Sequence, residues 1–197
     1  WEWMQRAVNA LATKNRVITD SLPSEPGSIA SINAKRGFDS FIDWLDQLLV
    51  RADVDTVALC SVSYGGWVAV HYAATRPTTI SSLSLVSTPS PNWQPSSRIE
   101  RYLRAPRLMA PVFAASSPFR LYPEIAVAFP SLRKRLRFAA ECLARAVSSP
   151  ATPTRMAERM RLAQQVDFES DCTRILAPTQ IVTGETDLDR VVPVDSS

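Results

Sequence analysis

Residues 56–75, TVALCSVSYGGWVAVHYAAT, decide the fold class of this chain. An apolar run typical of a buried strand, Thr56–Cys60, is followed by a second apolar run, Gly66–Thr75, typical of a buried helix that ends before Pro77. Only a short link separates the two, with Ser63 at its centre and small residues two positions to either side. Small side chains at those positions let a strand and a helix approach closely, so the segment predicts a sharp strand–helix turn.

Patterns on both sides of this turn extend the prediction. Helical spacing of apolar residues predicts helices over 1–13 and 34–51, and β-branched or apolar runs predict further strands over 16–20, 80–86 and 178–183. Helices and strands therefore alternate along much of the chain. Such alternation implies the α/β class, with a mostly parallel sheet flanked by helices.

Residues 90–170 interrupt this alternation, because they predict several helices and no clear strand. Between Arg98 and Arg161 there are 13 Lys and Arg against four acidic residues, a net charge of +9, whereas the rest of the chain carries −6. We therefore expect an inserted helical cap over 90–170 and a core formed by 1–89 and 171–197. Five aromatic residues of this cap either line an apolar substrate pocket or form the cap's own core: Trp93, Tyr102, Phe113, Phe119 and Tyr122.

Composition excludes several classes of protein. The chain has 197 residues, 46% of them hydrophobic and 21% charged, which is ordinary for a globular domain and excludes wholesale disorder. Three cysteines exclude a disulfide framework and a four-thiolate zinc site, and a single histidine argues against a histidine-rich metal site. Cys60, at the end of a predicted strand, is expected to be buried packing.

The sequence also allows expectations about binding partners and cellular location. The basic run Arg133–Arg137 has no array of stacking aromatics beside it, so we expect a solvated cap surface and no nucleic-acid partner. Serines, glycines and a histidine interrupt the apolar stretch 56–75, so we expect no membrane span. No secretory signal is visible, and we expect a cytoplasmic protein.

The turn Ser61-Val-Ser-Tyr-Gly65 resembles the nucleophile elbow of the α/β-hydrolase family, G-x-S-x-G, with Ser61 where the first glycine is usual. The likeness continues in chain order. Residues 16–28 resemble an early strand of the family and its following loop, and Arg76–Val86 resembles the helix exit and the next strand. Ala177–Glu185 resembles the strand that leads to the catalytic acid, and 90–170 occupies the place of the family's helical cap.

This resemblance implies a serine hydrolase that acts on an ester or related acyl substrate, a small molecule, without a metal or organic cofactor. Ser63 would attack the carbonyl carbon, and the backbone N–H of Tyr64 would bind the oxyanion. Asp189 is the implied acid, because Asp-x-Val-Val-Pro resembles the family's approach to its next helix. Asp187, which keeps the usual distance from Gly184, is the alternative.

The base is the missing member of this triad. His71 is the only histidine, and eight residues of helix put it about 12 Å along the axis from Ser63, so we expect it to be packed or bonded locally. In the family the catalytic histidine follows the acid by several dozen residues. We therefore expect an interior fragment whose catalytic histidine and first strands lie outside this chain.

Two further expectations depend on that interpretation. If the chain is complete, it would instead be a non-catalytic α/β-hydrolase-fold binding protein or a truncated inactive remnant. If the chain ends here, sheet edges that the family normally covers would also be open, which predicts aggregation or association into a homo-oligomer.

Overall fold

The computed structural model of the protein describes residues 4–25, 28–148 and 152–184. The chain forms two compact units, Trp1–Val54 and Asp55–Ser197. Within the described residues the first unit contains the helices α1 (Gln5–Ala12) and α2 (Asp39–Ala52). The second unit contains, in chain order, β1 (Val57–Val62), α3 (Tyr64–Thr75), β2 (Ile80–Val86), α4 (Ser97–Arg104), α5 (Pro106–Ala128), α6 (Leu132–Ser148), α7 (Pro153–Ala163), α8 (Phe168–Arg174) and β3 (Thr179–Val182).

The amphipathic helix predicted over 34–51 forms as α2, although it begins only at Asp39. The preceding residues form turns, and the ring of Phe38 lies against that of Phe41 at a centroid distance of 5.2 Å. The helix ends at Asp53, whose φ of 52° is left-handed and stops further helical hydrogen bonding. Of the residues whose spacing predicted the apolar face, Phe41, Ile42, Leu45 and Leu49 are buried in the helix and Leu48 is half-buried.

The strand predicted over 16–20 is wrong. These residues are irregular and belong to no sheet, although their β-branched composition suits a strand. Within the described residues no other segment forms a ladder with them, and extended backbone becomes a strand only when a neighbour accepts and donates its hydrogen bonds.

The sheet of the second unit is parallel, in the order β1-β2-β3. The predicted strands 80–86 and 178–183 form as β2 and β3, and the strand predicted over 56–60 extends two residues further as β1. Val62 pairs with Val86, and Val86 pairs with Val182, so the three strands end level with one another. The sheet therefore has one edge at which all three strands deliver their carboxyl ends.

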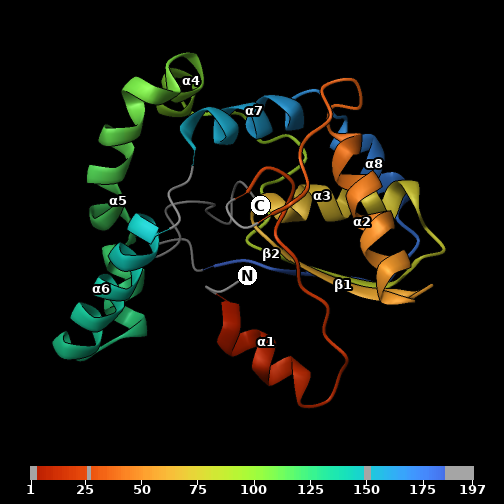
Figure 1. The fold of residues 1–197 in the computed structure, drawn as a ribbon, viewed down its shortest axis with the longest axis horizontal. Coiled ribbons are helices and arrows are strands. Elements are labelled where there is room, and N and C mark those ends of the chain that lie inside the picture. Colours follow the sequence, from red (N-terminus) through yellow and green to blue (C-terminus); the bar gives the residue numbers. More distant parts are fainter. Residues whose placement is uncertain (1–3, 26–27, 149–151, 185–197) are drawn as a thin grey trace. The chain divides into compact units, whose positions relative to one another are not determined.

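α3 packs on the sheet and on α8 (Figure 1). It is apolar on all sides, and most of its residues are buried, which is what a helix enclosed by neighbours requires. Residues of β1 alternate between half-buried and exposed positions. Cys60 falls on the exposed side, so the expectation that it is buried is wrong.

The described residues of 97–163 form the helices α4 to α7 with short links and no strand, as predicted, and they form a small core of their own. Tyr102, Leu103 and Ala157 are buried there, with the Phe113 ring 4.7 Å from that of Tyr102. Tyr102 and Phe113 therefore belong to the core of the helical region, whereas the side chains of Phe119 and Tyr122 are exposed. Among the described residues, no helix combines the length and apolar character that a bilayer crossing needs.

Candidate active site

Ser63 is the single residue between β1 and α3, so the turn is even tighter than the sequence predicted. Its backbone angles are φ 53° and ψ −125°, outside the regions that residues with a side chain ordinarily occupy. Two backbone hydrogen bonds hold this conformation. The Ser63 N–H donates to the Val86 carbonyl at 2.9 Å, and the Gly66 N–H donates to the Ser63 carbonyl at 2.8 Å. The strained residue is therefore fixed from the sheet and from the helix.

The small residues around Ser63 have different roles. A Cβ added to Gly66 would lie 1.9 Å from Oγ1 of Thr88, so this position accepts no side chain without movement of the loop after β2. A Cβ on Gly65 would be 3.8 Å from Cβ of Ser61, which is ordinary contact. Ser61 therefore fits where the family's first glycine is usual, and its hydroxyl donates to the Ser84 carbonyl at 3.4 Å.

Tyr64 is the first residue of α3, immediately after Ser63. The first amides of a helix have no acceptor within the helix, and the helix dipole adds partial positive charge at this end. The N–H of Tyr64 is therefore of the right kind to bind an anionic oxygen formed beside Ser63.

The edge of the sheet at Ser63 also receives the ends of the neighbouring strands. The Ser87 N–H donates to the Val182 carbonyl at 2.8 Å, one step along from the bond between Ser63 and Val86. Ser87, with φ 45°, is a second strained residue at this edge. Residues that follow Val182 consequently leave β3 at the same edge as Ser63. The two candidate acids, Asp187 and Asp189, lie outside the described residues.

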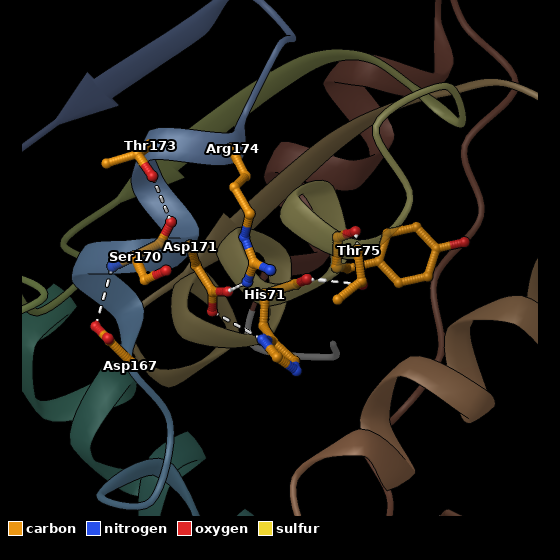
Figure 2. Close-up of polar contacts among 8 residues, drawn as sticks. His71, Thr75, Asp167, Ser170, Asp171, Thr173 and Arg174 are labelled. Atoms are coloured by element: carbon orange, nitrogen blue, oxygen red, sulfur yellow. Dashed lines mark hydrogen bonds and ion pairs between the residues drawn. The ribbon is translucent and has the colours of Figure 1, made fainter.

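His71 is bonded far from the turn, to a residue that the sequence analysis did not single out. Its Nδ1 lies 2.7 Å from Oδ2 of Asp171 on α8, and the side chains are 13% and 1% exposed. The guanidinium of Arg174 pairs with the other oxygen of the same carboxylate. Figure 2 shows the Asp171 carboxylate between the imidazole of His71 and the guanidinium of Arg174. His71 is bonded, as expected, but its partner is 100 residues away along the chain.

In the described part of the chain, neither the Cys172 thiol nor any cluster of metal-binding side chains suggests a second reactive site. Partial burial raises the pKa of the Cys172 thiol, and the charges of Asp171 and Glu169 raise it further, so this thiol is kept in its weakly nucleophilic protonated form. Within residues 4–25, 28–148 and 152–184, no group of three His, Cys, Asp or Glu side chains is placed to hold a metal ion.

No protein-family model matches the sequence, and no curated protein matches it significantly. Solved structures do match the fold. The enol-lactonase from Burkholderia xenovorans superposes with a TM-score of 0.76 at 17% identity, covering 99% of this chain and 71% of that one. For an alpha/beta hydrolase from a Medee basin deep-sea metagenome library the values are 0.73, 18%, 99% and 70%. For an esterase from Exiguobacterium antarcticum they are 0.71, 14%, 99% and 72%.

These likenesses confirm the predicted fold. The chain has the α/β-hydrolase fold, with a small parallel sheet and flanking helices. At such identities the comparisons concern the fold, and the chemistry of the turn at Ser63 has to be argued from its own geometry.

Proposed function

We propose that the protein is a serine hydrolase that cleaves an ester or a related acyl substrate, with Ser63 as the nucleophile. The observation that carries this proposal is the backbone of Ser63, with φ 53° and ψ −125° on a one-residue turn between strand and helix. Strained backbone persists only where the surrounding structure enforces it, and it concentrates at functional sites. The turn lifts Ser63 clear of the sheet at the edge where the strands end, a position from which its hydroxyl can meet a substrate.

The reaction would proceed through an acyl-enzyme. Oγ of Ser63 attacks the carbonyl carbon while a base takes its proton, and the carbonyl oxygen becomes an oxyanion that accepts from the Tyr64 N–H. Collapse of this intermediate expels the alcohol, which takes the proton from the base. Water then attacks the acyl-enzyme in the same manner and releases the acid. These steps need neither a metal nor an organic cofactor.

A serine nucleophile needs a base, and the base needs a carboxylate that orients it. The level ends of β1, β2 and β3 support an acid that follows β3 closely, as both Asp189 and Asp187 do. We keep Asp189 as the acid because of the Asp-x-Val-Val-Pro resemblance, with Asp187 as the alternative. His71 does not suit the role of base, because it stands two helical turns, about 12 Å along the axis, beyond Ser63. The histidine that this chemistry requires would come from outside the 197 residues.

The helical region would act as a cap over the substrate. In this proposal the core comprises 1–89 and 171–197, and the cap comprises 90–170. Its basic character and its own small core of Tyr102, Leu103 and Ala157 support a separately packed insertion. The fold shared with an esterase and an enol-lactonase is consistent with acyl chemistry.

A fluorophosphonate probe tests the proposal, because it phosphonylates only an activated serine. We expect the full-length protein to be labelled on the peptide that contains Ser63, and Ser63→Ala to abolish the labelling. Ser61→Ala is the matched control: it changes a serine two positions away on β1 and should leave labelling intact. Absence of labelling in a folded, full-length protein would overturn the proposal and favour a binding protein or an inactive remnant.

A further inference from the structure

The side chain of Tyr64 reaches out of the core and contacts the helical region. Its hydroxyl donates to the main-chain carbonyl of Arg159 on α7 at 3.0 Å. The guanidinium carbon of Arg159 lies 5.8 Å from the centre of the Tyr64 ring, within the range of a cation–π interaction. The residue that directly follows Ser63 is therefore held by a helix 95 residues further along the chain.

Aromatic packing strengthens this connection. The Trp67 ring lies edge-on to that of Tyr64 at 5.9 Å and is stacked on that of Phe168 at 5.4 Å. Trp93 also packs against Trp67, edge-on, with ring centres 5.5 Å apart. Trp93 precedes α4 and Phe168 begins α8, so the chain is fastened to the first turns of α3 both where it enters the helical region and where it leaves it.

We propose that Tyr64 is a positioning residue that couples α7 to the oxyanion site. This inference rests on the proposed function of Ser63. The main-chain N–H and the side chain belong to one residue, so a side chain fixed to α7 restrains the direction of the N–H. An oxyanion donor contributes fully only when its N–H is aimed at the developing charge. With α7 docked, Tyr64 is held from both sides; with α7 displaced, the donor loses one of its restraints.

Tyr64→Phe tests the coupling, because it keeps the ring and its packing and removes only the hydroxyl. We expect kcat for an ester substrate to fall about tenfold with KM nearly unchanged, since the restraint matters in the transition state. The rate at which a fluorophosphonate modifies Ser63 should fall by a similar factor, because that reaction also develops charge on an oxygen in the oxyanion site.

Tyr102→Phe is the matched control. The Tyr102 hydroxyl also donates to a main-chain carbonyl of α7, that of Pro153, at 3.2 Å, but Tyr102 belongs to the helical region's own core. Burial raises the pKa of this hydroxyl, although the charge of Arg159 opposes the shift, so it remains a donor near neutral pH. We expect Tyr102→Phe to lower the melting temperature about as much as Tyr64→Phe and to leave kcat unchanged. Equal kcat in the two variants would overturn the proposal.

Two further measurements separate this proposal from the one on which it rests. No labelling of Ser63 in the wild-type protein would overturn the serine hydrolase and, with it, the catalytic part of the coupling. Labelled wild type with an unchanged Tyr64→Phe would overturn the coupling alone. Amide hydrogen exchange along α7 reports the contact itself, and we expect it to accelerate in Tyr64→Phe; unchanged exchange would also count against the coupling.

Discussion

Ser63 has a backbone with positive φ, a conformation that glycine alone adopts without strain. If serine is kept here for its hydroxyl and not for stability, a protein with glycine at this position should be more stable than one with any residue that has a Cβ. We expect Ser63→Gly to exceed Ser63→Ala in free energy of unfolding by about 1 kcal/mol or more, measured by chemical denaturation.

The same pair of substitutions at Ser61 provides the control. Ser61 lies in the regular part of β1, where glycine weakens a strand by about 0.5–1 kcal/mol relative to alanine. The order of stability should therefore reverse between the two positions. If alanine is the more stable residue at both positions, the strained conformation of Ser63 is not what the protein has in solution.

Gly66 is required by a neighbour and not by its own backbone. Alanine here would bring its Cβ to 1.9 Å from Oγ1 and 2.6 Å from Cβ of Thr88, and Cβ is not a flexible end that can turn away. We expect Gly66→Ala to destabilise the fold by about 1–3 kcal/mol, the usual effect of overpacking, and to disturb the turn at Ser63.

Gly65→Ala tests whether this effect is specific. The two glycines are adjacent in the first turn of α3, but a Cβ at Gly65 meets only Cβ of Ser61 at 3.8 Å. Because alanine favours a helix over glycine by about 1 kcal/mol, Gly65→Ala should be neutral or stabilising. Similar melting temperatures for the two variants would contradict the close approach of Thr88.

One buried carboxylate adds a polar link between α3 and α8, beside the stacking of Trp67 on Phe168. Asp171 is 1% exposed as a side chain and is shared by His71 and Arg174, so it joins the C-terminal half of α3 to α8. Asp171→Asn keeps the shape of the side chain and removes the negative charge that His71 and Arg174 share. We expect it to lower the free energy of unfolding by about 1–3 kcal/mol, the usual range when a buried polar group loses a good hydrogen-bond partner.

Asp167→Asn makes the same chemical change on the same helix. Asp167 caps α8, accepting from the Ser170 N–H at 3.0 Å, and asparagine is an equally good cap. Its effect on stability should therefore be small. A comparable loss in both variants would mean that α8 is sensitive to any change of charge and that the pair with His71 is not special.

Local patterns predict most elements and the turn at Ser63, and they fail wherever a distant neighbour decides the outcome. The turn at Ser63 was predictable because strand, small residues and helix are contiguous in sequence. Residues 16–20 have the composition of a strand without a partner strand, and the alternation that exposes Cys60 depends on which side of β1 is covered. The contact between Gly66 and Thr88 and the pair His71–Asp171 join separate segments, so no local signal marks them.

The distribution of charge over the whole chain leads to a prediction about substrates. Residues 98–161 carry a net charge of +9 and the remainder −6, although the total is only +3. A positive region covering the site of the proposed reaction would raise the local concentration of anionic substrates. This attraction acts through water, so salt weakens it, with a screening length of about 10 Å at 0.1 M ionic strength.

We therefore expect KM for an ester that carries a carboxylate to rise about threefold or more between 50 and 300 mM NaCl, with kcat unchanged. An uncharged ester with the same leaving group is the control, because it feels no such attraction and its KM should stay level. A melting temperature measured across the same range of salt separates screening from a change in stability.

If both esters respond alike, the basic helices do not act on the substrate and serve only as a solvated surface. If only the charged ester responds, neutralising single arginines of α4 and α7 should reduce its salt dependence stepwise, since each removes one unit of the charge responsible.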